Sequence, residues 1–203
     1  MAEIKNVVFD IGNVIVNWSP AEIVRLTFGA AKATDELTSS IFKSDLWMAL
    51  NRGEMPESEA KLMYQERLGF TTEHTDQLFY YVKHTQLILF GSLNLLQRVK
   101  SAGYRTFALT DNVNEIVDHL KSQYDFWPLF DGTIVSSELG CMKPHPEIFN
   151  HLLDQHNLSA TECVFIDDMP HNLKGATSLG FSGIQFENAD QCERELKSLG
   201  LSF

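Results

Sequence analysis

The stretch that decides the fold is residues 4–14, which read Ile4-Lys5-Asn6-Val7-Val8-Phe9-Asp10-Ile11-Gly12-Asn13-Val14. An apolar run ends at Asp10 and passes into a turn that contains Gly12. A buried strand followed by such a turn is typical of an open parallel sheet, which binds ligands beyond the carboxyl ends of its strands. Asp10 is therefore placed to take part in chemistry, although Asp-x-Gly also describes an ordinary turn.

Three further polar clusters follow apolar runs in the same way. They are Thr110-Asp111-Asn112 after residues 104–109, Lys143 in a loop, and Asp167-Asp168 after residues 163–166. With Asp10 they provide a carboxylate nucleophile, a hydroxyl and a lysine for phosphate, and a carboxylate pair for a hard cation. This set predicts a magnesium-dependent phosphohydrolase.

The pattern of the whole chain predicts an α/β fold with a doubly wound, mostly parallel, Rossmann-like sheet. Strand patterns at residues 104–109, 132–135, 163–166 and 182–186 alternate with amphipathic helices, as is typical of parallel sheets. Residues 92–102 are expected to form the helix before the second strand, and residues 189–199 the last helix.

Residues 18–89 differ from the rest, because helical patterns follow one another there without a convincing strand. An all-helical block between the first and second strands indicates an insertion that covers the open strand ends. We therefore expect an α/β core domain made of residues 1–17 and 90–203, and a helical cap domain made of residues 18–89.

Charge and hydropathy limit the classes of partner. The 203 residues include 27 acidic and 16 basic side chains and carry a net charge of -11, which argues against nucleic acids and anionic membranes. No apolar stretch approaches the roughly 20 residues that span a bilayer. The three cysteines lack metal-ligand spacing, so we expect free thiols and a cytoplasmic protein. The sequence does not determine the oligomeric state.

The chain resembles the haloacid dehalogenase superfamily, most of whose members are phosphatases. The motifs that carry the resemblance run nearly the whole length of the chain and are Phe9-Asp10-Ile11-Gly12-Asn13-Val14, Leu109-Thr110-Asp111-Asn112, Lys143-Pro144 and Ile166-Asp167-Asp168-Met169-Pro170-His171-Asn172. The resemblance implies a Rossmann-like core with a small helical cap, a Mg²⁺ cofactor and a small phosphorylated metabolite as substrate. The chain is most similar to a branch that includes a glucose-1-phosphate phosphatase, which adds sugar phosphates to the expected substrates.

The resemblance also implies a metal site. Asp10, the expected nucleophile, would bind Mg²⁺ together with the backbone carbonyl of Gly12 and the carboxylate of Asp168, with Asp167 in the outer shell. Asn172 would support the metal loop. From the residues alone, the acidic pair can also be read as the start of the following helix, where negative charge favours the helix dipole.

For the phosphate, the resemblance implies the hydroxyl of Thr110, the backbone amides of Asp111 and Asn112, and the ammonium of Lys143. The alternatives are a Thr-x-Asn helix cap and a solvated surface lysine. His145 belongs to the residue type best suited to proton transfer at neutral pH, although its position also fits the start of a helix.

One position departs from the family pattern. Phosphatases of the superfamily normally carry an aspartate two residues after the nucleophile, where this chain has Gly12. That aspartate protonates the leaving group, and general acid help of this kind is worth about 10²- to 10⁴-fold. The alternatives are a dehalogenase, which also lacks this aspartate, and a catalytically weak phosphate-binding or regulatory protein. The Asp167-Asp168 pair disfavours the dehalogenase, because dehalogenases of the superfamily need no magnesium.

Substrate choice is expected to depend on the cap. Trp18, Trp47, Asn51 and Arg52 are candidates, since an aromatic ring and an arginine beside a turn can hold a sugar or a second anion. The alternative is that the tryptophans form the core of the cap and that Arg52 is solvated.

Overall fold

The centre of the molecule is a five-stranded parallel sheet, seen in the computed structural model of residues 3–203. Its strands are β1 (Asn6–Phe9), β2 (Arg105–Thr110), β3 (Gly132–Val135), β4 (Cys163–Asp167) and β5 (Ser182–Gln185). Their order is β3-β2-β1-β4-β5, so that β1 lies between β2 and β4. The chain order reverses at β1, and such a switch point is where open α/β sheets bind ligands. The predicted α/β class and strands are confirmed.

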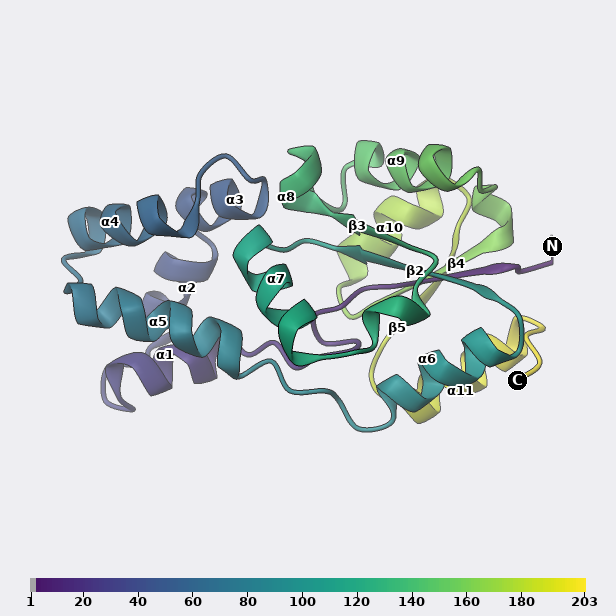
Figure 1. Ribbon diagram of the computed structural model, residues 1–203, viewed down its shortest axis with the longest axis horizontal. Coiled ribbons are helices and arrows are strands. Elements are labelled where there is room, and N and C mark those ends of the chain that lie inside the picture. The colour runs from purple at the N-terminus through teal and green to yellow at the C-terminus, as the bar shows by residue number, and fades with distance from the viewer. Residues whose placement is uncertain (1–2) are drawn as a thin grey trace.

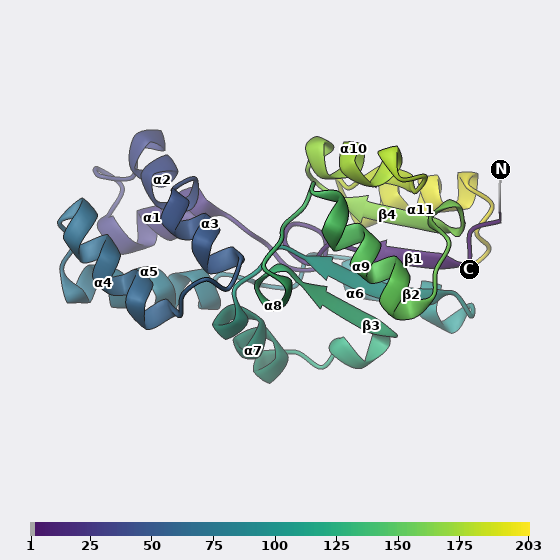
Figure 2. The ribbon, with the colours of Figure 1, turned by 90° about the horizontal axis from the view of Figure 1, so that it is seen from above.

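Side chains of the strands alternate between two apolar cores, one on each face of the sheet. Val7 and Phe9 belong to the larger core, whereas Val8 belongs to the second. The helices over the larger core are α6 (Ser92–Ser101), α7 (Asn114–Gln123) and α11 (Ala189–Ser198), and those over the second are α9 (Pro146–His156) and α10 (Pro170–Ser178) (Figures 1 and 2). The shorter elements are η1 (Trp127–Leu129), α8 (Ser136–Leu139) and η2 (Ala160–Glu162). No helix within residues 3–203 has the length and apolar character needed to cross a membrane.

Residues 18–89 contain helices that lie beyond the carboxyl ends of the strands (Figure 1). They are α1 (Pro20–Phe28), α2 (Asp35–Phe42), α3 (Asp45–Asn51), α4 (Glu57–Leu68) and α5 (Thr72–His84). All but α4 begin at a serine or threonine whose hydroxyl accepts a backbone N–H of the first turn, which fixes their starts. The larger apolar core continues from the sheet into these helices. The division into two domains at residues 17 and 90 stays a prediction.

Two contacts hold the end of α3 over the strand ends. The hydroxyl of Ser136 donates to the carbonyl oxygen of Asn51 at 2.6 Å. Gly53 approaches the backbone of Ser137 so closely that a Cβ there would lie 2.1 Å from the carbonyl oxygen, and its φ is +67°. Only glycine combines this conformation with such an approach. The helical segment is therefore attached to the sheet next to the residues that form the site.

Candidate active site

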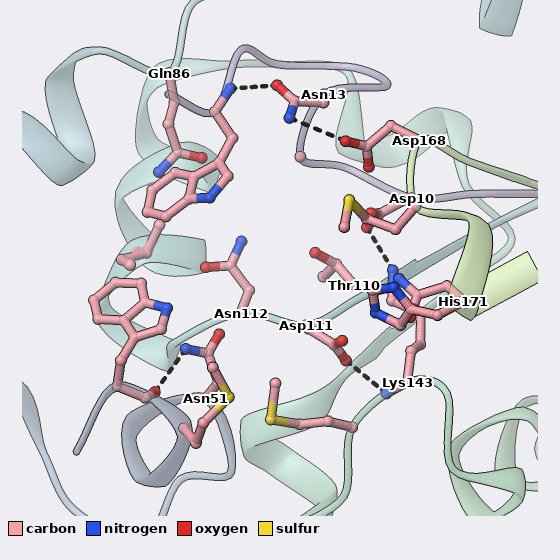
Figure 3. A pocket seen from close by; sticks show the side chains of 18 residues that line it. Asp10, Asn13, Asn51, Gln86, Thr110, Asp111, Asn112, Lys143, Asp168 and His171 are labelled. Atoms are coloured by element: carbon pink, nitrogen blue, oxygen red, sulfur yellow. Dashed lines mark hydrogen bonds and ion pairs between the residues drawn. The ribbon is translucent and has the colours of Figure 1, made fainter. Parts of the chain in front are cut away.

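A cavity of about 290 Å³ opens at the carboxyl ends of the strands. Asp10 follows β1, Thr110 ends β2 and Asp168 follows β4, so three strands bring side chains to it. Lys143 reaches the same cavity from the loop after α8. Figure 3 shows these four residues on one side of the cavity, and residues of the helical segment on the other. The structure thus brings together the four polar clusters that the sequence singles out.

Lys143 is the positive centre of this group. Its Nζ lies 3.0 Å from an oxygen of Asp10 and 2.8 Å from an oxygen of Asp167, and its side chain is 1% exposed. Burial alone would lower the pKa of Lys143, but the charges of Asp10 and Asp167 raise this pKa above its ordinary value. Burial raises the pKa of Asp10, and the charge of Lys143 opposes that rise. Lys143 therefore stays an ammonium that pairs with both carboxyl groups.

Asp167 is fully buried, and both of its oxygens are engaged. Oδ1 accepts the backbone N–H of Met169 at 2.8 Å and Nδ2 of Asn172 at 3.1 Å. Oδ2 accepts Nζ of Lys143 at 2.8 Å and the same Asn172 nitrogen at 3.1 Å. An ionised carboxylate has about four lone-pair sites, so little capacity is left for a direct metal bond. This geometry suits a position behind the metal, with Asn172 as support.

Asp10 and Asp168 differ from Asp167, because each keeps one oxygen to which no described residue donates a hydrogen bond. Ligand oxygens of these three carboxylates lie within 4.8 Å of one another. Burial raises the pKa of Asp168, as expected for a poorly solvated carboxylate. Mg²⁺ prefers oxygen ligands and binds through one or two carboxylates plus waters and phosphate oxygens. The residues therefore fit magnesium, with Gly12 beside them on the cavity wall.

Asn13 links the first motif to the fourth, a role that its place in the sequence does not reveal. Its Nδ2 donates to Oδ2 of Asp168 at 3.1 Å, and its Oδ1 accepts the backbone N–H of Trp18 at 2.8 Å. Its φ of 53° lies in the left-handed region, which asparagine adopts more readily than most residues other than glycine. The turn that presents Asp10 is therefore tied to Asp168 by one amide.

The expected phosphate ligands are only partly available. Thr110 is 1% exposed, and no described residue pairs with its hydroxyl, which lines the cavity. The backbone N–H of Asn112 donates to the hydroxyl of Ser136 at 2.9 Å, so the expectation that this amide binds phosphate is not met. Asp111 accepts the backbone N–H of Lys143 at 3.0 Å and so fixes the lysine loop. The side chain of Asn112, rather than its backbone, faces the cavity.

The position of the missing aspartate is open. A Cβ at Gly12 would lie 3.7 Å from the Cβ of Trp18, which is an ordinary van der Waals contact. His145 is not among the residues that line the cavity, whereas His171 is, on the same side as Asp10 (Figure 3). His171 is exposed. Its position three residues after Asp168 is the sequence feature from which its place in the cavity lining could have been predicted.

The far side of the cavity is aromatic and uncharged. The rings of Trp18 and Trp47 are stacked, with centroids 5.8 Å apart and an interplanar angle of 15°. The amides of Asn51 and Gln86 lie beside them, and sequence reasoning did not include Gln86. The apolar part of the lining is completed by Met48, Ile116, Met142 and Met169.

Arg52 does not reach this cavity. Its guanidinium donates to both carboxylate oxygens of Glu54, at 2.5 and 3.1 Å, and the pair lies at the surface. A bidentate pair to a neighbour two residues away satisfies the group locally. The expectation that Arg52 contacts a substrate therefore has no support in this arrangement.

Comparison with known sequences agrees with the arrangement of the motifs. The family model of haloacid dehalogenase-like hydrolases matches residues 4–180. The chain is 24% identical over 195 residues to the sesquiterpene phosphatase astK of Aspergillus oryzae, with 96% of each chain covered. It is 28% identical over 207 residues to the D-ribitol-5-phosphate phosphatase of Bacteroides thetaiotaomicron, which covers 95% of this chain and 97% of the relative.

Comparison with solved structures supports the fold. A HAD family enzyme from Bacteroides thetaiotaomicron, crystallised in complex with magnesium and inorganic phosphate, superposes with a TM-score of 0.77. The two chains are 22% identical, and the match covers 91% of this chain and 95% of the other. At this identity, the likeness concerns the fold alone.

Proposed function

Because this chain belongs to the haloacid dehalogenase-like hydrolase family, we propose that it hydrolyses small phosphomonoesters with Mg²⁺ as its cofactor. Asp10 is the nucleophile and forms an aspartyl phosphate. The substrate is a small phosphorylated metabolite, and sugar phosphates are included in this class. Support comes from relatives that are phosphatases, a sesquiterpene phosphatase and a D-ribitol-5-phosphate phosphatase.

The main support for this proposal is that the two carboxylate oxygens of Asp10 differ in their hydrogen bonding. Oδ1 accepts the backbone N–H of Ile11 at 2.7 Å and lies 3.0 Å from Nζ of Lys143. No hydrogen bond from the described chain reaches Oδ2, and Asp10 lines the cavity. A carboxylate held through one oxygen and free at the other is oriented for attack on an electrophile.

The first step transfers the phosphoryl group to the enzyme. Oδ2 of Asp10 attacks phosphorus, the bond between phosphorus and the ester oxygen breaks, and an aspartyl phosphate forms. The ammonium of Lys143 and the hydroxyl of Thr110 hold the phosphoryl oxygens through hydrogen bonds. Bound magnesium, held by Asp10, Asp168 and the carbonyl of Gly12, would supply positive charge to the same oxygens.

The second step restores the enzyme. Because Gly12 has no side chain, the leaving oxygen takes its proton from water in the cavity. The hydroxide left by that transfer takes a proton from a second water molecule as this water attacks phosphorus. The bond between phosphorus and Oδ2 of Asp10 breaks, inorganic phosphate leaves, and the carboxylate of Asp10 is free again. The sum is an ester plus water giving an alcohol plus phosphate. Without an acid at position 12, the rate should depend strongly on the pKa of the leaving group.

We also propose that residues 18–89 act as a cap domain, since this segment supplies Trp18, Trp47, Asn51 and Gln86 to the cavity. The dehalogenase alternative is disfavoured by Asp168, whose free oxygen suits a metal that a dehalogenase of this superfamily does not need.

A screen of phosphomonoesters with metal-depleted protein tests the function. Phosphate release should need added Mg²⁺ and should be lost in the Asp10→Asn variant. Chloride release from a 2-chloro acid without Mg²⁺ would instead identify a dehalogenase. If Mg²⁺ binds but no ester is hydrolysed, the chain is better described as a catalytically weak phosphate-binding or regulatory protein. Gly12 is consistent with this alternative, because it lacks the side chain of a general acid.

A further inference from the structure

The half of the cavity away from the nucleophile offers a ligand only uncharged groups. All ionisable residues of the lining lie on the phosphate side in Figure 3, and they are Asp10, Asp111, Lys143, Asp168 and His171. The opposite half contains the amides of Asn51 and Gln86, with Asn112 between the two halves. Whatever the phosphate is attached to must therefore be recognised without a charged partner.

Each of these amides is held in one orientation by a backbone hydrogen bond. Asn51 and Gln86 each donate their side-chain nitrogen to the carbonyl oxygen four residues earlier, at 2.8 Å in both cases. Asn112 uses its side-chain oxygen to accept the N–H of the next residue at 2.9 Å. The atoms left over are thus defined: the side-chain oxygen and the second N–H of Asn51 and of Gln86, and the side-chain nitrogen of Asn112.

These leftover atoms have no partner within the described part of the chain. Asn51, Gln86 and Asn112 are only 4%, 3% and 9% exposed, so a ligand in the cavity is the natural partner for them. The indole N–H groups of Trp18 and Trp47 likewise make no hydrogen bond to residues 3–203. Oriented polar atoms that lack partners in a buried site mark a place built to bind polar groups, because leaving them unpaired is costly.

The mixture of donors and acceptors selects the chemistry of the ligand. A carboxylate or a second phosphate cannot donate to the oxygens of Asn51 and Gln86, and an ammonium group cannot accept from the nitrogen of Asn112. An alkyl or terpenoid chain would leave all three amides unpaired. A hydroxyl both donates and accepts, and the faces of the tryptophans can cover the carbon chain that carries it.

We propose that the leaving group is an uncharged polyhydroxy group, a polyol or sugar, bound by Asn51, Gln86 and Asn112. The inference rests on the proposed phosphatase function and narrows its substrate class. The cavity of about 290 Å³ has room for about ten water molecules of about 30 Å³ each. It therefore suits a small ester, such as the phosphate of a polyol of about five carbons.

The test compares esters whose leaving groups differ in hydroxyl content, charge or size. They are a pentitol 5-phosphate, n-pentyl phosphate, the 5-phosphate of the corresponding aldonic acid, and farnesyl phosphate. The value of kcat/KM should be at least about 100-fold higher for the pentitol ester than for pentyl phosphate, because the latter leaves the amides unpaired. The aldonic acid ester should be worse than the pentitol ester by a similar factor, since its carboxylate meets acceptor oxygens.

The Gln86→Met variant tests whether Gln86 is responsible for the preference for the pentitol ester. Gln86→Met keeps the length of the side chain and removes the acceptor, so the ratio between pentitol and pentyl esters should fall at least about tenfold. Gln123 lies exposed at the end of α7, and Gln123→Met should leave that ratio unchanged. Circular dichroism of both variants checks that the fold is kept.

Three outcomes overturn the inference. If pentyl or farnesyl phosphate is the better substrate while p-nitrophenyl phosphate is hydrolysed with Mg²⁺, the proposed function stands and the polyhydroxy leaving group is wrong. The same holds if Gln86→Met does not change the ratio. If no ester is hydrolysed, p-nitrophenyl phosphate included, the phosphatase function itself fails and this inference fails with it.

Discussion

The two sides of the cavity hold their side chains in place by different means. On the phosphate side, Lys143 lies 3.0 Å from Asp10 and 2.8 Å from Asp167, and its side chain is 1% exposed. On the other side, Asn51 and Gln86 are held by neutral hydrogen bonds to the backbone of their own segment. The first side is a network of charges from two strand ends and a loop, and the second is a set of local contacts.

This difference indicates that the phosphate side of the cavity determines the reaction and that the opposite side determines substrate selectivity. A buried charge is tolerated only with a partner. A change on the phosphate side should therefore lower the rate or metal binding, and a change that leaves a charge unpaired should lower stability as well. A neutral amide that is already bound to the backbone can be exchanged with little effect on its neighbours. We therefore expect large effects on the phosphate side and changes of selectivity on the other.

The largest expected effect is that of Asp10→Asn, which removes the nucleophile and keeps the shape. The rate should fall by about 10⁴-fold or more, whereas the free energy of unfolding should not fall, because Lys143 still has Asp167 as a partner. Steady-state kinetics with p-nitrophenyl phosphate and urea unfolding measure both. Asp154→Asn, at an exposed position of α9, is the matched control. A loss of rate of less than about tenfold would remove Asp10 from the mechanism.

The next largest effect is expected at Lys143 and tests whether the buried charges of Lys143, Asp10 and Asp167 stabilise one another. Lys143→Met leaves Asp10 and Asp167 buried without their cation, which should lower the free energy of unfolding by about 3–5 kcal/mol in metal-free buffer. Lys174→Met, at an exposed position, should change it by less than about 0.5 kcal/mol. Equal stability of the two variants would show that the phosphate side is not a coupled network.

A smaller effect concerns the metal alone. Asp168→Ala should weaken Mg²⁺ binding by at least about 100-fold while the far-ultraviolet circular dichroism stays the same. Titration calorimetry of Mg²⁺ measures the affinity, and Asp125→Ala at an exposed position should leave it unchanged. Unchanged affinity in the Asp168 variant would place the metal elsewhere.

The smallest effect is expected at Gly12, where a side chain can be added to the phosphate side. Because a Cβ there meets only the Cβ of Trp18 at 3.7 Å, Gly12→Asp should fold and supply the missing acid. It should raise kcat/KM for alkyl phosphates about 10- to 100-fold and for aryl phosphates much less. The dependence of kcat/KM on leaving-group pKa, measured for both proteins, should be steep in the parent and shallower in the variant. A shallow dependence in the parent would reveal another proton donor, with His171 the first to test.

The same contrast explains what the sequence could predict. The strands, the alternation of their two faces, and the residues that follow β1, β2 and β4 are local features, because an apolar run and the polar cluster after it adjoin in the chain. Parallel pairing then brings the clusters together at one edge of the sheet. Asp10, Thr110 and Asp168 could therefore be named before the fold was known, whereas Lys143 was named from the resemblance of its loop to the superfamily motif.

What the sequence could not predict depends on contacts between distant segments. Gln86 lies in the loop between α5 and α6 and looks like any polar residue of a loop. Only the fold turns its amide into the cavity. The contact from Asn13 to Asp168 spans 155 positions. The sequence predicts Arg52 as an anion ligand. Its guanidinium instead pairs with Glu54, and this pairing depends on the geometry of the turn after α3.

The central claim is that Asp10 carries the phosphoryl group, and acid quenching during turnover tests it most directly. Metal-loaded protein is mixed with p-nitrophenyl phosphate, quenched within one turnover, digested and analysed by mass spectrometry. The account predicts phosphate on the peptide that contains Asp10 and nowhere else, and no phosphopeptide from Asp10→Asn. Phosphate on another residue, His171 for example, or full turnover without any phosphorylated peptide would contradict it.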